Sequence, residues 1–278
     1  MLITSTQNPK IKQLLELQQK SSERRRTGLF VVEGQRELEH CLAAGYELES
    51  VFALHNSEIA IHNSLSFLPD QAQANYELFE VSPHVYERIA YRGSTEGIIA
   101  VVRAKHLTLA ELESLPSGRV EGAAPLYIVL ESVEKPGNLG AVLRSADAAR
   151  ATAVIVCDPL TDLYNPNLIR ASIGACFTVT TVACTSEECI AFMKAHGVKI
   201  LTAQLQDSHL YYDTDMAGPT AIVMGTESTG LTEQWRQAAD AHIRIPMLGQ
   251  LDSLNVSVSA AILLFEAVRQ RQKKSVDE

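Results

Sequence analysis

The second half of the chain alternates short, continuous apolar runs with segments in which apolar residues recur at helical spacing. The run 126–130 (Leu-Tyr-Ile-Val-Leu) is typical of a strand buried on both faces of a sheet. Further strands are expected at 152–156, 198–203, 220–224 and 242–245. Helices are expected near 138–150 and 186–196, from Thr232 and from about 255. This alternation predicts an α/β fold, a parallel sheet with helices on both faces.

The first hundred residues predict a separate, smaller α/β unit. Apolar residues at helical spacing begin after Asn8-Pro9, and the segment Arg24-Arg25-Arg26-Thr27-Gly28 is expected to end that helix. A second helix is expected to follow the turn at Glu33-Gly34 and to end at Gly45. Strands are expected at 29–32, 46–53 and 97–102. We expect this unit to end near Lys105.

Residues 106–124 differ from both flanking units. A leucine-rich stretch leads into Ser-Gly and Gly-Ala-Ala segments, which predicts a connector with a short helix and a flexible joint at Pro116-Ser117-Gly118. The predicted organisation is a first domain over 1–105, a linker over 106–124 and a second domain over 125–278.

Composition narrows the class of protein. The chain has 278 residues, of which 46% are hydrophobic and 21% charged, as in globular proteins. Its five cysteines are scattered and form no Cys-x-x-Cys pair, so we expect buried or half-buried thiols with neither a disulfide framework nor a metal site. The apolar runs are too short for a bilayer span and the N-terminus does not resemble a signal peptide, which together predict a cytoplasmic protein.

Charge is unevenly distributed. The formal net charge is −9, which by itself argues against a nucleic-acid partner. Residues 1–30, however, hold six Lys and Arg side chains against Glu16 and Glu23. The local distribution of charge must therefore decide which partner the chain binds.

Three loops of the second domain follow expected strands and carry candidate chemistry. The first contains Pro136-Gly137-Asn138 and then Arg144, which together offer a helix N-terminus and a guanidinium to an anion. A capped helix with an exposed arginine is the other interpretation, because Asn is an ordinary N-cap residue.

The second loop is Met224-Gly225-Thr226-Glu227, continuing to Gly230. It is neither a P-loop nor a Gly-x-Gly-x-x-Gly dinucleotide motif. Gly225 allows a ligand to approach the backbone closely, and Glu227 could accept hydrogen bonds from hydroxyls or amines. A glycine-rich turn with a solvated Glu is the alternative.

The third loop runs from Ile245-Pro246-Met247 to Ser253-Leu254-Asn255 and opens an almost wholly apolar helix. Ser253 and Asn255 are also candidate N-caps of that helix. Since ligands of open parallel sheets bind beyond the carboxyl ends of the strands, three such loops could build one anion or nucleotide site.

Taken together, these segments resemble the SpoU (TrmH-like) branch of the SPOUT superfamily of RNA methyltransferases. The matching motifs are Pro-Gly-Asn-Leu-Gly-x-x-x-Arg-x-Ala at 136–146, Met-Gly-x-Glu-x-x-Gly at 224–230 and Ile-Pro-Met…Ser-Leu-Asn-Val-Ser at 245–257. The resemblance covers about 125–272. The N-terminal unit also looks like the small, ribosomal-protein-like substrate-binding domain that precedes such catalytic domains.

The resemblance implies a trefoil knot near the C-terminus, S-adenosylmethionine as cofactor, a homodimer and methyl transfer to a ribose 2′-hydroxyl of RNA. The positions that match the family's catalytic or RNA-facing residues are Asn138, Arg144, Glu227, Ser253 and Asn255. The positions that match its cofactor-binding loops are Thr202, Ala203, Met224, Gly225, Ile245, Met247 and Leu254.

The family resemblance assigns Arg144 a role in removing the hydroxyl proton. A guanidinium stays protonated at ordinary pH, so we expect instead that Arg144 clamps the phosphate beside the target ribose. Asn138 would orient the hydroxyl, and positioning of the methyl donor would carry much of the rate.

Basic residues of the N-terminal unit and of the first loop are candidates for backbone contacts with RNA, although a solvated helix face explains the segment 10–26 equally well. The candidate RNA-binding residues are Lys10, Lys12, Arg24, Arg25, Arg26, Arg92 and Lys135. Tyr86 and Tyr91 could stack on bases, but packing is the expectation for both. Ribosomal RNA is favoured over tRNA because an N-terminal substrate domain accompanies the enzymes of larger RNAs more often. A non-catalytic RNA-binding or assembly protein that keeps the fold is the alternative of a different class.

Overall fold

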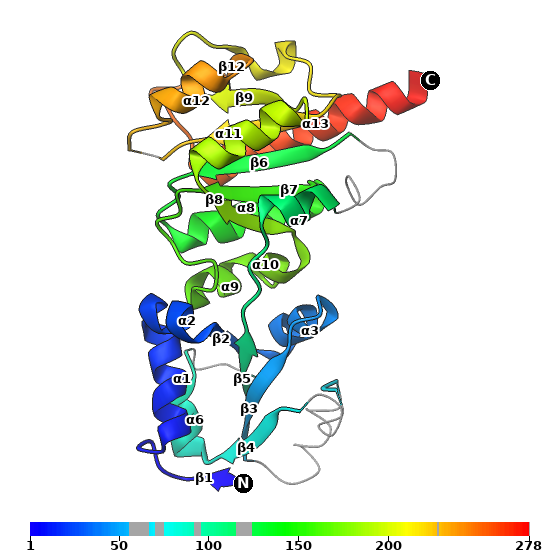
Figure 1. The fold of residues 1–278 in the computed structure, drawn as a ribbon. Coiled ribbons are helices and arrows are strands. Elements are labelled where there is room, and N and C mark those ends of the chain that lie inside the picture. The colour runs from blue at the N-terminus through cyan, green and yellow to red at the C-terminus, as the bar shows by residue number, and fades with distance from the viewer. Residues whose placement is uncertain (56–66, 70–74, 92–95, 115–123, 227, 278) are drawn as a thin grey trace. The chain divides into compact units, whose positions relative to one another are not determined.

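The computed structural model describes residues 1–55, 67–69, 75–91, 96–114, 124–226 and 228–277 (Figure 1). The chain forms two compact units. The first comprises Met1–Lys105 together with Asp162–Thr178, and the second comprises His106–Thr161 and Val179–Glu278. The segment 162–178, which falls inside the expected range 125–278, thus packs with the N-terminal unit. The expected joint at Pro116-Ser117-Gly118 lies outside the described residues.

The first unit is built on a mixed sheet of five strands in the order β1-β4-β3-β5-β2. Strands β2 and β3 pair with β5 in antiparallel fashion, whereas β4 pairs in parallel with β1 and β3. Its elements are β1 (Leu2–Ile3), α1 (Pro9–Gln19), α2 (Ser21–Thr27), β2 (Leu29–Glu33), α3 (Gln35–Ala43), β3 (Leu48–Leu54), β4 (Glu77–Val81), α6 (Pro83–Ile89), β5 (Ile98–Arg103), α9 (Pro166–Ser172) and α10 (Ala175–Thr178).

Helices cover both faces of this sheet because successive strand residues point to opposite sides. Val31 and Val101 face a core that α1 and α6 complete, whereas Phe30 and Val102 face a core that α3, α9 and α10 complete. The second core explains why 162–178 belongs here. The rings of Phe30 and Tyr164 stack with centroids 4.3 Å apart.

One helix boundary differs from the expectation. The Asn8 side chain caps α1 by accepting from the backbone N–H of Lys10 at 2.9 Å, as the Asn-Pro pair suggests. The arginine segment was expected to end the helical region, but Arg24, Arg25 and Arg26 continue it as α2. The chain leaves α2 only at Gly28, whose φ of +66° is a conformation that glycine adopts without strain.

The second unit confirms the predicted parallel sheet with helices on both faces. Its seven strands are ordered β10-β12-β9-β11-β6-β7-β8, and every described pairing among them is parallel. Helices α8 and α13 pack on one side of the sheet, and α7, α11 and α12 pack around Trp235 on the other (Figure 1). The elements are α7 (Leu109–Ser114), β6 (Leu126–Glu131), α8 (Pro136–Ala148), β7 (Ala153–Cys157), β8 (Thr181–Cys184), α11 (Ser186–Ala195), β9 (Lys199–Ala203), β10 (His209–Leu210), a 3₁₀ turn (Tyr211–Asp213), β11 (Thr220–Met224), α12 (Glu233–Ala238), β12 (Ala241–Arg244) and α13 (Val256–Asp277).

The sequence pattern located the central strands within one or two residues but missed the short edge strands β8 and β10. Strands β6, β7 and β11 are buried along their whole length, so they read as continuous apolar runs. An edge strand of two to four residues carries no such signal. Among the described residues, no helix is long and apolar enough to cross a membrane.

Candidate active site

The carboxyl ends of β9, β11 and β12 open onto a cavity of about 660 Å³ in the second unit. The segment 203–206 contributes one wall, the loop after β11 a second, and the loop from β12 to α13 a third. A crevice at the carboxyl edge of a parallel sheet is where such folds bind ligands. The second and third sequence motifs therefore meet at one site.

Most residues expected to hold a cofactor line this cavity. They are Ala203, Met224, Gly225, Ile245, Met247 and Leu254, and the candidate catalytic residues Ser253 and Asn255 lie beside them. Thr202 differs. It is fully buried on β9 and its hydroxyl is hydrogen-bonded to Nδ1 of His242 at 2.6 Å, so its side chain supports the sheet rather than the cavity wall.

Gly225 is required because the backbone of its own loop passes close to it, whereas the sequence suggested close approach of a ligand. A Cβ atom at this position would lie 2.2 Å from the carbonyl carbon of Gly230 and 2.4 Å from the nitrogen of Leu231. The close approach is thus made by the loop to itself. The backbones of Thr226 and Gly230 exchange two hydrogen bonds, 3.1 and 3.3 Å long, and close the turn. Glu227, a candidate catalytic residue, lies outside the described residues.

A buried carboxylate also anchors the end of the loop that follows β11. Glu131, at the end of β6, is 3% exposed and accepts hydrogen bonds from the backbone N–H and the hydroxyl of Thr232, at 2.8 and 2.6 Å. The hydroxyl of Ser186 in turn accepts from the indole N–H of Trp235 at 3.0 Å and donates to Asp158 at 2.6 Å. These bonds join the carboxyl ends of β6 and β7 to the first residue of α11 and to the start of α12.

The first motif reaches the site through Asn138. This residue lines a smaller cavity of about 110 Å³ together with Lys135, Gly225 and Val256. Its Oδ1 accepts a hydrogen bond from Nδ2 of Asn255 at 3.2 Å. Asn138 is not the N-cap of α8, a place that Lys135 occupies, so the simple capping interpretation is wrong for this residue.

Asn255 combines both interpretations that the sequence left open. Its Oδ1 accepts from the backbone N–H of Ser257 at 2.9 Å, which caps the start of α13. Its amide nitrogen is directed to Asn138. Ser253 is exposed and lines the larger cavity.

Arg144 lies apart from these residues. It is exposed on α8, beyond Asn138 by less than two turns, and does not belong to the described lining of either cavity. An exposed guanidinium at this place is accessible to a large anion. Within one chain the structure does not bring Arg144 into the cavity.

Gln204 and Arg236 are among the polar residues of the cavity wall that sequence reasoning missed. Gln204 Oε1 and Arg236 Nε are buried atoms for which the described part of the chain provides no hydrogen-bond partner. Buried polar atoms are rarely left unpaired, so a ligand group is expected to meet them. Neither residue falls in a glycine-rich motif, which is why the sequence carried no signal for them.

The candidate RNA-binding residues of the first unit lie in different surroundings. Lys12 and Arg25 are exposed, whereas Lys10 is ion-paired with Glu77 and Arg26 with Glu23. Arg92 lies outside the described residues.

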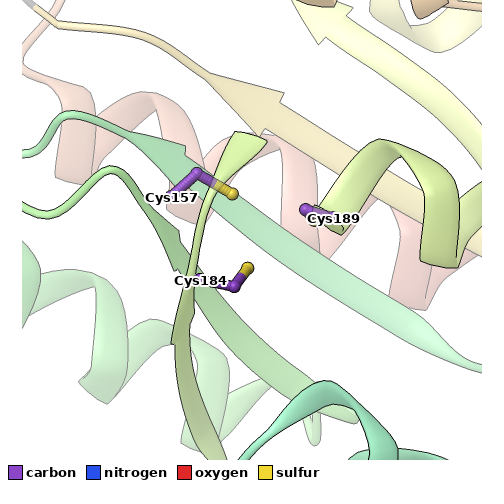
Figure 2. A group of neighbouring side chains, drawn as sticks. All are labelled: Cys157, Cys184 and Cys189. Carbon is purple, nitrogen blue, oxygen red and sulfur yellow. The ribbon is translucent and has the colours of Figure 1, made fainter. Parts of the chain in front are cut away.

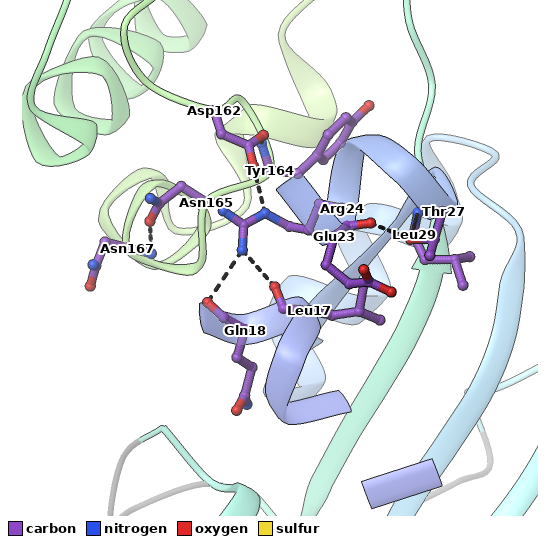
Figure 3. A network of polar contacts seen from close by, with 10 residues as sticks. All are labelled: Leu17, Gln18, Glu23, Arg24, Thr27, Leu29, Asp162, Tyr164, Asn165 and Asn167. Carbon is purple, nitrogen blue, oxygen red and sulfur yellow. Dashed lines mark hydrogen bonds and ion pairs between the residues drawn. The ribbon is translucent and has the colours of Figure 1, made fainter. Parts of the chain in front are cut away.

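Arg24 is not available to RNA, contrary to the expectation. It is 5% exposed, and Figure 3 shows its guanidinium between Asp162 and the end of α1. Nε donates to Asp162 Oδ2 at 2.5 Å, and one terminal nitrogen donates to the carbonyl oxygens of Leu17 and Gln18 at 2.5 and 3.2 Å. Arg24 therefore holds the segment 162–178 within the first unit.

The two aromatic candidates differ, and only Tyr86 confirms the packing expectation. Tyr86 is buried in the core beside α1. Tyr91 is 47% exposed, but its hydroxyl donates to Asn167 at 3.1 Å and Arg170 lies over its ring at 5.4 Å.

A ligand cavity at the carboxyl edge of a parallel sheet, with residues of the second and third motifs in its wall, places this protein among the ligand-binding α/β proteins. Residues 125–265 match the SpoU rRNA methylase family, and residues 8–100 match the MRM3-like substrate binding domain. The chain belongs to the SpoU rRNA methylase family, which confirms the resemblance drawn from the three motifs.

Individual relatives agree with this assignment. The chain is 39% identical over 181 residues to the 23S rRNA (guanosine-2'-O-)-methyltransferase RlmB of Photobacterium profundum, covering 64% of this chain and 73% of that protein. It is 26% identical over 263 residues to the 23S rRNA (guanosine(2553)-2'-O)-methyltransferase RlmP of Bacillus subtilis, covering 95% and 97%.

Solved structures are similar over nearly the whole chain. A crystal structure of an RNA 2'-O ribose methyltransferase matches with a TM-score of 0.77 and 40% identity, covering 98% of this chain and 100% of that one. An AdoMet-bound rRNA methyltransferase from Sinorhizobium meliloti matches with a TM-score of 0.85 and 26% identity, covering 97% of each chain.

Proposed function

We propose that this protein transfers a methyl group from S-adenosylmethionine to a ribose 2′-hydroxyl of 23S ribosomal RNA. The observation that carries the proposal is the junction of the two cavities, where Asn138 and Asn255 meet beside the turn that begins at Gly225. Membership of the SpoU rRNA methylase family and the similarity to 23S rRNA methyltransferases support the same reaction and substrate.

The larger cavity fits the cofactor. Its volume of about 660 Å³ lies within the range of small-molecule sites. Met224, Ile245 and Leu263 offer apolar surface to an adenine ring. The unpaired atoms of Gln204 and Arg236 offer an acceptor and a charged donor, which suit the ammonium and carboxylate groups of S-adenosylmethionine. When bound there, the cofactor supplies an activated methyl group.

The chain's own residues orient the acceptor. Asn138 presents an amide at the mouth of the smaller cavity, in reach of a ribose hydroxyl, and Asn255 fixes that amide through their hydrogen bond. Exposed Lys135 and Arg144 on the same segment supply positive charge for the flanking phosphates. With these roles, the positioning of the ribose hydroxyl against the methyl donor, rather than a strong base, is the main source of the rate.

Exposed Lys12 and Arg25 of the first unit offer positive charge to an RNA backbone. The match of residues 8–100 to a substrate binding domain supports the assignment of this unit to RNA recognition. Ribosomal RNA in the cytoplasm is accordingly the substrate that we favour over tRNA.

The active form is a homodimer with a trefoil-knotted catalytic unit. Five large apolar side chains are exposed from the third motif to the middle of α13, namely Leu248, Leu251, Leu254, Val258 and Phe265. An exposed apolar stretch beside the site is typical of a surface that a second subunit covers. Sedimentation should give twice the chain mass, and Phe265→Glu should give the monomer with loss of methyl transfer.

Transfer of labelled methyl groups from S-adenosylmethionine to unmodified 23S rRNA tests the reaction, with 16S rRNA and total tRNA as alternative acceptors. Label at one 2′-O-methyl ribose of 23S rRNA is expected, and Arg144→Ala should lower transfer without weakening cofactor binding. Arg236→Gln should weaken cofactor binding. Label in tRNA alone would contradict 23S rRNA as the substrate. Cofactor binding without label in any RNA or assembly particle would instead favour a non-catalytic RNA-binding protein.

A further inference from the structure

Three cysteine thiols converge at one edge of the second unit. The Sγ atoms of Cys157, Cys184 and Cys189 all lie within 4.8 Å of one another (Figure 2). Cys157 and Cys189 are fully buried, and Cys184 is half-buried. The three residues come from three different elements, since Cys157 ends β7, Cys184 ends β8 and Cys189 lies in the first turns of α11.

The fold holds these positions firmly. Cys157 and Cys184 are direct partners in the parallel pairing of β7 with β8, so their side chains emerge on the same face of the sheet. The chain then turns at Thr185 into α11, where a capping box between Thr185 and Glu188 fixes the helix start. The backbone N–H of Cys189 bonds to Thr185 at 3.1 Å. The third sulfur is thus delivered to the other two by a rigid strand-to-helix connection.

The electrostatic setting favours a cation. The charged groups acting on Cys184 are the carboxylates of Glu188 and Asp158, which add negative charge. Three cysteine sulfurs beside two carboxylates are a better host for a soft cation than for any anion.

We propose that Cys157, Cys184 and Cys189 form a zinc site that fastens the edge strand β8 and the start of α11 to the body of the sheet. Thiolate sulfurs bind zinc at about 2.3 Å, which in a tetrahedral site separates them by about 3.8 Å. The three sulfurs lie within 4.8 Å of one another, which is compatible with closure onto one ion. Solvent would complete the coordination of an ion held by these three residues.

Binding is an exchange of protons for metal. A hydrated zinc ion bonds to the sulfurs of Cys157, Cys184 and Cys189, and their thiol protons pass to solvent. No electron is transferred. Uptake should therefore release protons and should tighten as pH rises.

The same protein contains an internal comparison. Cys41 is a buried thiol and Cys176 a half-buried one, but they lie in the first unit and outside the group of three sulfurs. Buried thiols that serve only packing should resemble this pair. The convergence of sulfurs from two strands and a helix distinguishes the site in the second unit from ordinary core cysteines.

Cobalt substitution tests the site in the full chain, reduced with a phosphine and freed of metal. Added Co²⁺ should give an intense sulfur-to-cobalt charge-transfer band with about one ion per chain, and Zn²⁺ should abolish it. Cys184→Ser and Cys189→Ser should weaken cobalt binding at least about tenfold. Cys41→Ser and Cys176→Ser, as matched controls, should leave the band unchanged.

A second measurement does not depend on variants that fold. Zinc should protect Cys184 of the unaltered protein from alkylation, read by peptide mass spectrometry, while leaving Cys176 unprotected. Absence of the cobalt band, or a band that survives in both cluster variants, would overturn the proposal. A disulfide among the three cysteines without metal uptake would overturn it as well. None of these readouts requires methyl transfer, so the proposed catalytic function and the zinc site can fail separately.

Discussion

The side-chain amide nitrogen of Asn255 donates a hydrogen bond to Oδ1 of Asn138 over 3.2 Å, across 117 positions of the sequence. The bond joins the start of α13 to the first turn of α8, and these two helices pack together on one side of the sheet. Both residues also border the cavities assigned to cofactor and acceptor. The first and third motifs are therefore one structural unit.

Breaking this pair should lower catalysis more than cofactor binding. Asn138→Ala and Asn255→Ala should each reduce the rate of methyl transfer by about 100-fold, because the acceptor hydroxyl loses its orientation. Asn138 lies outside the lining of the larger cavity, so cofactor affinity of Asn138→Ala, measured by calorimetry, should be nearly unchanged. The double variant should lose less than the product of the two single effects. Strictly multiplicative losses would contradict a shared role.

Arg24 is expected to be a stability residue of the first unit. Arg24→Ala removes one partner of the buried pair with Asp162 and should lower the free energy of unfolding by about 3–5 kcal/mol. Its neighbour Arg25 is exposed, and Arg25→Ala should change stability by less than about 0.5 kcal/mol. Urea titration of both variants checks the difference. If both variants change the free energy of unfolding only slightly and Arg24→Ala weakens RNA binding, Arg24 contacts RNA, as the sequence suggested.

Gly225 should tolerate no side chain. Gly225→Ala places a methyl group 2.2 Å from the backbone of Gly230, so the turn must open and the cavity wall must move. We expect at least about a tenfold loss of cofactor affinity and about 1–3 kcal/mol of destabilisation. Gly218→Ala is the matched control, since a Cβ atom there meets nothing within 4 Å. A Gly225→Ala protein that binds cofactor normally would show that the turn is not part of the site.

The buried tyrosine pair predicts a loss of stability at alkaline pH. Burial raises the pKa of both Tyr46 and Tyr164 in the folded protein. Such groups contribute stability that is complete below their unfolded pKa of about 10 and is lost as pH rises through the raised folded pKa. The melting temperature should fall between neutral pH and a pH of about 11. Tyr46→Phe should make that fall smaller. Substitution of the exposed Tyr212 by Phe should leave the profile as it was.

The sequence predicted those elements correctly whose residue types are determined by local burial or by local backbone geometry. The run 126–130 had to be a central strand because both faces of β6 are buried, and Asn8-Pro9 had to begin a helix because it caps one. The second and third motifs located much of the wall of the larger cavity, since each follows a strand whose carboxyl end is recognisable, and the first motif located Asn138 of the smaller one. Short edge strands and the helices of 162–178 escaped because few of their residues are tied to a periodic pattern.

Predictions about individual side chains were less secure. Thr202 and Arg24 carry the residue types that binding sites use, yet one supports the sheet through His242 and the other holds Asp162. Gln204 and Arg236 lie in no motif, yet both border the cavity. A side chain's partner depends on which distant segment folds against it, and that information is not local.

The sequence by itself determined the class of this protein: the order of buried strands, the helices between them and the three loops of the SpoU rRNA methylase family. These are set by local patterns of burial and turn geometry. Only the tertiary structure decided which polar atoms remain unpaired in the cavity and that Asn138 meets Asn255. It alone brought together Cys157, Cys184 and Cys189, whose spacing along the chain predicted no metal site. Strand pairing places residues far apart in sequence within bonding distance, and the chemistry of a site depends on that distance.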